Sequence, residues 1–206
     1  MANSKKRCKL CKMYVPVESG VQPPAGFFCC HEHAIAFANA KVRESNKRQA
    51  RAKHRADKER LKTKSEWMKE AQAEFNRFIR IRDHNQECIS CDKPWQQIES
   101  DQQWKVGGAW DAGHFRTRGA AGHLRFNTYN VHRQCKKCNG GGGRFSHKAA
   151  TVDSRYREKL VGKIGLHRVE KLENSSESRS FDIEYLKRVK RIFAKRARIY
   201  KKLFRA

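Results

Sequence analysis

Two matched cysteine pairs constrain the fold of this chain more than any other feature. Cys88-x2-Cys91 is followed, after 43 intervening residues, by Cys135-x2-Cys138. Each C-x2-C turn supplies two thiolates from one tight knuckle, so two such pairs complete a tetrahedral zinc shell. A redox motif or unconnected buried cysteines would not account for two matched pairs, and the flanking sequence lacks the βαβ pattern of a thioredoxin-like site. A shell closed by four protein ligands predicts a structural zinc rather than a catalytic one.

A second group of cysteine and histidine residues lies near the N-terminus. Cys29 and His33 are four residues apart, so one helical turn could direct both side chains at one ion. Cys30 or His31 could replace either of these two ligands, and the alternative to a metal site is a basic tail with incidental cysteines. We predict a second zinc site with three thiolates and one imidazole, from Cys8, Cys11, Cys29 and His33.

The composition argues against a membrane protein and indicates a polyanionic partner. The 206 residues include 47 Lys and Arg against 21 Asp and Glu, a formal charge of +26, and only 38% are hydrophobic. No run approaches the roughly 18 apolar residues of a bilayer crossing. No apolar segment follows the first basic residues, so we expect a protein of a reducing cytoplasm, where eight cysteines hold metal rather than form disulfides.

The positive charge is concentrated at the two ends of the chain. Residues 1–64 carry a formal +11, residues 65–150 carry +5, and residues 151–206 carry +10. A strongly basic protein attracts polyanions at long range, so we expect nucleic acid as the partner. The chain is also too polar to fill one large core, which predicts small metal-stapled modules joined by long charged helices.

The pattern of apolar residues predicts three long helices. Residues 34–64 lack Gly and Pro and have almost no apolar stripe, so they form an exposed or partly disordered basic arm that could order on a phosphate backbone. Ser65 is the expected N-cap of a second helix that ends near residue 83. Its aromatic stripe belongs to the core rather than to a base-stacking surface. The stripe comprises Trp67, Ala71, Phe75, Phe78, Ile79 and Arg82.

The third helix is expected over residues 182–204, after a shorter helical stretch at 156–172 that Gly162 and Gly165 interrupt. Ten Lys or Arg and no acid occupy residues 187–205, among them the DNA contacts that we predict at Lys190 and Arg191. The same helix can therefore pack and bind phosphates. Its expected apolar face comprises Leu186, Val189, Phe193, Tyr200 and Leu203.

The segment between the first and second knuckles carries a family resemblance. The run Trp-Asp-Ala-Gly-His-Phe-Arg at 110–116 is followed by Leu-Arg-Phe-Asn at 124–127 and by a run at 130–139 that ends in C-x2-C-Asn. This order resembles the His-Me finger (HNH-type) nucleases, in which a β-hairpin and a helix hold one metal. More closely, the runs are similar to the NinG (Rap) recombination proteins of lambdoid phages, and the resemblance extends over most of the chain.

The resemblance implies structure-specific cutting of branched DNA, notably Holliday junctions and D-loops. His114 matches the general base, Asn139 matches a ligand of the divalent metal, and Asn130 matches the central Asn that orients the loop. In many of these nucleases the residue before the base is itself a ligand. Here it is Gly113, so Asp111 is our candidate for the carboxylate ligand.

The chemistry of phosphodiester cutting independently requires such residues. A histidine that titrates near neutrality can take a proton from water, and Mg²⁺ or Mn²⁺ held by Asp and Asn oxygens supplies positive charge. His132 is either a phosphate contact or a structural residue, whereas His123 and His147 match nothing. Residues 140–143 are a flexible turn and not a P-loop. Four arginines are predicted phosphate contacts, namely Arg116, Arg118, Arg125 and Arg133.

Together these arguments predict an α+β protein with a zinc-stapled ββα (His-Me finger) core, long basic helices and an N-terminal zinc knuckle. We expect a zinc module at 1–33, a basic arm at 34–64, a nuclease core at 65–150 and a basic helical region at 151–206. The rival functions are a non-catalytic zinc protein that binds DNA during recombination and an HNH nuclease on ordinary duplex DNA. Because a four-way junction needs two cuts, we expect a homodimer, with phage or host recombination proteins as further partners.

Overall fold

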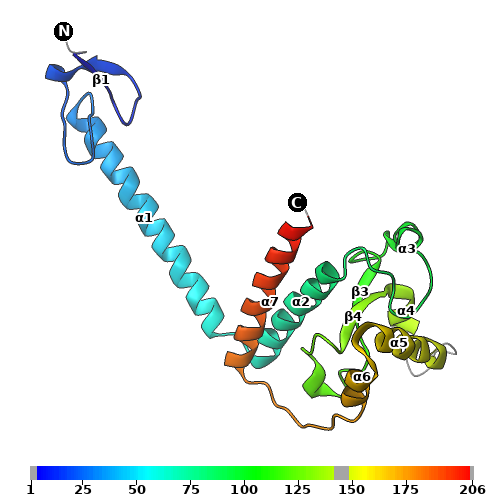
Figure 1. Cartoon of the computed structure of the whole chain (residues 1–206). Helices are drawn as coiled ribbons and strands as arrows, with labels where there is room; N and C mark the ends of the chain where they lie inside the picture. Colours follow the sequence, from blue (N-terminus) through cyan, green and yellow to red (C-terminus); the bar gives the residue numbers. More distant parts are fainter. Residues whose placement is uncertain (1–3, 142–148, 205–206) are drawn as a thin grey trace. The chain divides into compact units, whose positions relative to one another are not determined.

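A computed structural model describes residues 4–141 and 149–204 of the chain. It divides into two compact units, Met1–Lys62 and Thr63–Ala206. The predicted α+β class is confirmed, since helices dominate both units and each unit contains one small two-stranded sheet (Figure 1). The four predicted domain boundaries stay predictions. No helix in the described part of the chain is long and apolar enough to cross a membrane.

The N-terminal unit contains a small sheet followed by one long helix. Strands β1 (Lys5–Arg7) and β2 (Tyr14–Pro16) pair antiparallel, and the short 3-10 helix η1 covers Val17–Ser19. Helix α1 then extends over His31–Arg60. None of the α1 side chains is buried. The predicted basic arm is therefore a continuous exposed helix of about 45 Å, at 1.5 Å per residue.

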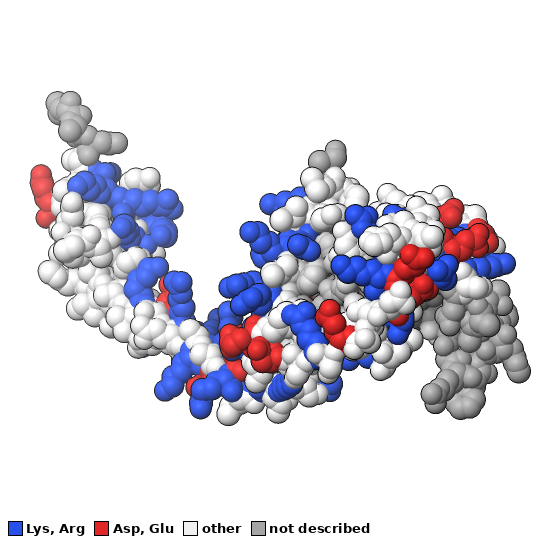
Figure 2. All heavy atoms as spheres, turned by 60° about the horizontal axis from the view of Figure 1, so that its bottom comes forward, with Lys and Arg blue, Asp and Glu red and all other residues white. Residues whose placement is uncertain are grey.

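Charge covers much of the surface of both units. Figure 2 shows Lys and Arg side chains spread over the face in view, with Asp and Glu confined to smaller groups. Along α1 the few ion pairs are local, for example Lys41 with Glu44 at 3.3 Å. The predicted excess of cationic side chains therefore reaches solvent.

In the second unit, helix α2 (Lys64–Arg82) begins two residues earlier than a Ser65 cap would place it and has a different N-cap. The Oγ1 atom of Thr63 accepts a hydrogen bond from the backbone N–H of Glu66, and the Glu66 carboxylate accepts from the Thr63 backbone N–H at 2.8 Å. This reciprocal pair is a capping box, which Ser65 could not form because Met68 follows it three residues later. The prediction of Ser65 as the N-cap was wrong.

Helix α7 (Ile183–Leu203) packs along α2 (Figure 1). Asp182 caps it, and its side chain accepts from the Tyr185 backbone N–H at 2.6 Å. The ring of Phe193 meets that of Phe75 edge to face, with 4.7 Å between centroids, so the aromatic stripe of α2 is core as predicted. One predicted face residue, Leu203, is 66% exposed instead, and at this end of the helix pair it is the ring of Phe204 that lies near His84, with 5.6 Å between centroids.

A β-hairpin lies against α2 and carries the candidate site. Strands β3 (Trp110–His114) and β4 (Val131–Cys135) pair antiparallel with His114 opposite Val131. The short helix α4 (Lys136–Gly141) follows β4 directly, and α3 (Trp95–Gln102) and the 3-10 helix η2 (Gly122–Leu124) lie in the connections. All five β4 residues are buried, so this strand is the centre of the unit.

Two further helices close the hairpin unit. Helix α5 (Ala149–Ile164) continues through Gly162, and the break before α6 (Leu166–Glu173) falls at Gly165 alone, where φ is +85°. With ψ at 150°, Gly165 has a backbone conformation that glycine adopts readily and that residues with a side chain rarely adopt. The predicted turn at 140–143 extends outside the described residues, as does His147.

Candidate metal centres and catalytic cavity

The four predicted cysteines of the central unit come together. The Sγ atoms of Cys88, Cys91, Cys135 and Cys138 all lie within 4.8 Å of one another, which fits four thiolates around a tetrahedral Zn²⁺. Backbone N–H groups point at the sulfurs, for example Cys135 N to Cys88 Sγ at 3.3 Å. Such donors favour the thiolate form that zinc requires. A zinc ion here would join the end of β4 and α4 to the loop after α2.

The N-terminal cluster has the predicted membership. The ligand atoms of Cys8, Cys11, Cys29 and His33 lie within 4.8 Å of one another, with Cys29 Sγ at 2.8 Å from His33 Nδ1. Cys30 is directed elsewhere, and its Sγ lies 3.8 Å from the Glu32 carboxylate. Three thiolates and one imidazole also fit a tetrahedral Zn²⁺. Both cysteine-rich clusters could therefore hold zinc.

A cavity of about 330 Å³ lies between α2, β3 and α4. The structure brings three of the four predicted catalytic residues to it, Asp111 and His114 from β3 and Asn139 from α4. The lining residues are Asn76, Asp111, Ala112, His114, Thr117, Arg118 and Asn139.

His114 is positioned as a neutral base. Its Nε2 lies 3.2 Å from the backbone carbonyl oxygen of Arg125, which can only accept, so Nε2 carries the proton and Nδ1 is the acceptor nitrogen. Burial lowers the pKa of His114 to about 4, and the charges of Arg118 and Arg125 act in the same direction. The imidazole is therefore neutral near pH 7 and able to accept a proton.

Asp111 and Asn139 are direct neighbours in this cavity. The Asn139 Nδ2 donates to Asp111 Oδ2 at 3.0 Å, and the Lys136 ammonium lies 3.7 Å from Asp111 Oδ1. A side chain at Gly113 would not fit, since its Cβ would lie 2.0 Å from Oε1 of Gln134. The strand therefore brings one carboxylate to the cavity, that of Asp111, and its oxygens together with the Asn139 amide are hard donors suited to Mg²⁺ or Mn²⁺.

Asn130 lies outside the cavity and organises the loop beside it. The side chain is fully buried, its Oδ1 accepts from the Arg116 backbone N–H at 2.8 Å, and its Nδ2 donates to the Arg116 carbonyl at 3.0 Å. Backbone bonding from Phe115 to the Asn130 carbonyl continues the hairpin beyond β3. These bonds hold the loop that places the Arg125 carbonyl on His114.

The four predicted phosphate-binding arginines have different surroundings. Arg118 is exposed and lines the cavity, Arg116 donates to the Glu173 carbonyl, and Arg125 donates to Gln72 Oε1 at 3.3 Å. Arg133 is only 4% exposed.

The burial of Arg133 corrects its predicted role. Its guanidinium donates to Glu99 at 3.0 Å and stacks on the Trp110 ring at 3.6 Å. A side chain enclosed in this way packs the hairpin against α3 and does not reach a phosphate. On α7, Arg191 is exposed as predicted, whereas Lys190 is half-buried and bonded to Glu70 at 2.9 Å.

Several residues that matter to the site gave no sequence signal. Asp83 is 1% exposed, and both its oxygens accept from the Arg82 guanidinium. Burial alone would raise the pKa of Asp83, but its contacts with His132 and Arg82 hold that pKa well below its usual range. The buried His132 accepts from Arg82 at 3.0 Å, so the structural alternative for this histidine is the one observed. Asn76 reaches the cavity from α2, and no local motif marked it.

The fold and these sites define a class: a basic α+β protein with two four-ligand metal-type clusters and a cavity that contains a histidine, a carboxylate and an amide. The family model described as Bacteriophage Lambda NinG protein matches residues 1–203. The chain therefore belongs to the NinG family.

Curated relatives agree with this assignment. The chain is 31% identical over 201 residues to Protein ninG of Escherichia phage 933W, which covers 91% of this chain and 89% of that protein. It is 39% identical to Protein ninG of Escherichia phage lambda over 130 residues, 63% of this chain and 55% of that protein. Protein ninG of Salmonella phage P22 is 38% identical over the same shares. No solved structure matches the chain significantly.

Proposed function

We propose that this NinG family protein is a metal-dependent endodeoxyribonuclease of the His-Me finger type that cuts branched DNA. The observation that carries the proposal is the cavity in which His114, Asp111 and Asn139 meet. Strand β3 supplies both Asp111 and His114, and the short helix α4, which follows β4 directly, supplies Asn139.

His114 acts as the general base. Its Nδ1 takes one proton from a water molecule, whose oxygen forms a bond to phosphorus while the bond to the leaving sugar oxygen breaks. The leaving oxygen takes a proton from solvent. The Arg125 carbonyl oxygen accepts a hydrogen bond from Nε2 at 3.2 Å, so Nε2 keeps its proton during this step. The same hydrogen bond stabilises the imidazolium that forms.

Asp111 and Asn139 would hold a divalent cation, which supplies positive charge against the charge that builds on the phosphate and the leaving oxygen. The two side chains already lie 3.0 Å apart. Asn139 directly follows Cys138 within α4, so a zinc ion bound to the cysteine cluster would fix its position. In this proposal the zinc ions are structural and the third metal is catalytic.

The choice of branched DNA follows from the resemblance to the recombination proteins together with the cationic surface. Arg118 at the cavity and exposed cations such as Arg191 on α7 would contact phosphates on more than one side of the second unit. Two cuts resolve a four-way junction, so the proposal includes a homodimer. Phage or host recombination proteins are its proposed partners.

The test compares labelled four-way junction with linear duplex of matched sequence, each with and without Mg²⁺. We expect cutting of the junction that depends on Mg²⁺. His114→Ala should bind the junction normally but cut it at least ~100-fold more slowly, because it removes the proton acceptor and no positive charge.

The control is Arg155→Gln, since Arg155 pairs with Asp92 on the surface and does not line the catalytic cavity. Cutting at the wild-type rate by His114→Ala would overturn the assignment of the base. Tight binding without cutting in any divalent metal would favour the non-catalytic rival, and equal cutting of both substrates would favour an ordinary duplex nuclease.

A further inference from the structure

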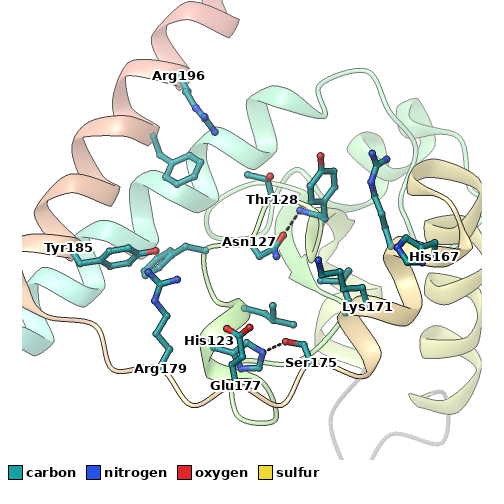
Figure 3. Close-up of a pocket in the computed structure, with 16 residues that line it drawn as sticks. His123, Asn127, Thr128, His167, Lys171, Ser175, Glu177, Arg179, Tyr185 and Arg196 are labelled. Carbon is teal, nitrogen blue, oxygen red and sulfur yellow. Dashed lines mark hydrogen bonds between the residues drawn. The ribbon is translucent and has the colours of Figure 1, made fainter.

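A second and larger cavity, of about 690 Å³, lies on the second unit. Its residues come from η2 and the loop after it, from helix α6, from the loop before α7 and from α7, and Figure 3 shows, for example, Asn127, Lys171, Arg179 and Tyr185 from these segments. This volume falls within the roughly 300–1,000 Å³ typical of ligand sites. Neither the predicted catalytic residues nor the cysteine clusters line it.

Three arginine–aromatic pairs surround this cavity. Arg168 lies over the ring of Tyr129 at 5.3 Å, Arg179 lies over Tyr185 at 4.6 Å, and Arg196 lies over Phe193 at 5.4 Å, each measured to the ring centroid. The three arginines come from α6, from the loop before α7 and from α7 itself. Stacked guanidinium and aromatic planes at one site offer flat apolar faces next to positive charge.

The charge of the lining is strongly positive. Lys171 joins the three arginines, and Glu177 is the one acidic side chain among the lining residues. Tyr129 is 48% exposed, and Arg168, Lys171 and Arg179 are exposed as well. Water-accessible cations and aromatic rings are therefore both available to a ligand.

We propose that this cavity binds a single-stranded segment of DNA. Unpaired bases have free π-faces that stack on aromatic and guanidinium planes, and each carries a phosphate for the neighbouring cations. Paired bases in a duplex are stacked on each other and cannot enter a cavity of this kind. The exposed Tyr129 ring with its Arg168 neighbour is the principal stacking element, and Lys171 and Arg196 contact the strand's phosphates.

The location gives the site a role in substrate choice. The residues on both sides of Arg125, His123 and Leu124 before it and Phe126 to Tyr129 after it, line this cavity, and the backbone carbonyl of Arg125 itself accepts from His114. One loop thus holds the proposed base and contacts the proposed strand. In this part the inference rests on the proposed nuclease: single-stranded DNA at a branch would direct cutting to the adjacent duplex arm.

The test measures binding of a fluorescein-labelled oligothymidylate of about 16 nucleotides by anisotropy, without added divalent cation, next to a duplex of equal length. Tyr129→Ala should weaken single-strand binding roughly 5- to 100-fold, the range for loss of one stacked base, and leave duplex binding within about twofold. Tyr129→Phe should restore it, because the ring and not the hydroxyl stacks.

The matched charge control compares Arg168→Gln with Arg155→Gln. The first removes an arginine from the cavity, and the second removes an arginine that forms an ion pair with Asp92 elsewhere on the surface. Only Arg168→Gln should weaken single-strand binding selectively. An oligothymidylate that carries 5-iododeoxyuridine should crosslink under ultraviolet light to Tyr129 or Tyr185.

The proposal would be overturned if Tyr129→Ala bound the single strand with wild-type affinity, or if it lost affinity equally for the single strand and the duplex. Displacement of the strand by equimolar thymidine monophosphate would also overturn it, because it would indicate a free-nucleotide site. These readouts do not involve cutting. If the wild-type protein cuts nothing while Tyr129→Ala selectively loses single-strand binding, the nuclease proposal fails and the single-strand site stands. If the wild-type protein cuts junctions while Tyr129→Ala binds single strands normally, the single-strand site fails and the nuclease proposal stands.

Discussion

The two units of this protein are stabilised in different ways. In the N-terminal unit the buried apolar side chains are Cys8, Phe27 and Phe28 among the residues described, and α1 contributes none. The second unit has an aromatic core between α2 and α7 that does not involve its cysteines. A second cluster of apolar residues packs α5 and α6 against the hairpin loop.

The difference indicates that two similar metal-type ligand sets can contribute differently to the stability of the units that contain them. Where few apolar side chains are buried, a bound zinc ion would have to supply most of the folding free energy. Where a core exists, a bound zinc ion would fix only the segment that contains its ligands, here the end of β4, α4 and the first knuckle. The second case matters for function, because that segment carries Asn139.

The largest expected effect is loss of structure on removal of one cluster ligand. Cys11→Ser should unfold the N-terminal sheet and leave the second unit intact, because structural zinc sites contribute on the order of 10 kcal/mol to folding. Cys135→Ser should release α4 and the first knuckle but leave the α2–α7 core helical.

Metal analysis should return about two zinc per wild-type chain and about one per variant, and hydrogen exchange would locate the loss. Fully folded zinc-free protein, or global unfolding by Cys11→Ser, would contradict the comparison.

The next effect concerns the cavity of the second unit. Asn139→Ala should slow junction cutting about 100-fold, with partial rescue by high Mg²⁺ or by Mn²⁺, because it removes one metal donor and leaves Asp111. His114→Ala should not be rescued by metal. Cys11→Ser provides the contrast, since it should not change the rate at saturating protein. A rate loss in Cys11→Ser as large as that in Asn139→Ala would mean that the N-terminal unit takes part in the chemistry.

A smaller effect is expected from the charge of α1. Four cations on one stretch of this helix can be replaced together: Lys47→Gln, Arg51→Gln, Arg55→Gln and Lys58→Gln. Binding of every DNA shape should weaken, and the slope of log affinity against log salt should become shallower by about 0.9 for each phosphate that the helix no longer neutralises. Binding measured between low and moderate salt decides this, and an unchanged slope would show that α1 does not bind DNA.

The smallest effect is on the pH dependence of stability. Since the pKa of His114 is lowered to about 4, the folded state stays neutral where the unfolded chain binds a proton. Stability is therefore complete above about pH 6.5 and falls toward pH 4, by up to ~3 kcal/mol for this group. His114→Gln should flatten this part of the profile in denaturant titrations.

Acid would also release bound zinc, but it would do so equally in the wild type and in His114→Gln. The difference between their two stability profiles therefore reports on His114. Burial also lowers the pKa of His132, so some slope should remain in the variant. Asp83 contributes only at lower pH, because its pKa is depressed. Identical profiles of the two proteins would contradict the assignment of a buried neutral His114.

Local patterns were the parts of the structure that could be predicted. C-x2-C spacing, the Phe75 and Phe78 stripe of α2 and the start of the last helix near Asp182 depend on residues a few positions apart, and all three were predicted correctly. The prediction of Ser65 as the N-cap was wrong because Thr63 is followed three residues later by Glu66, with which it forms a capping box. The prediction of Arg133 as a phosphate contact was wrong because its burial depends on Trp110 and Glu99, which are distant in the sequence.

The sequence by itself determined the metal-type ligand sets, the basic character of both ends and the three long helices, because spacing, charge and periodicity act over short stretches. Only the tertiary structure decided which side chains share a cavity. Asn76, Asp111 and Asn139 lie on three elements, and their meeting depends on hairpin register and helix packing, which no local pattern encodes. The same is true of the Arg168 and Tyr129 pair, since it requires α6 to dock beside the loop before β4.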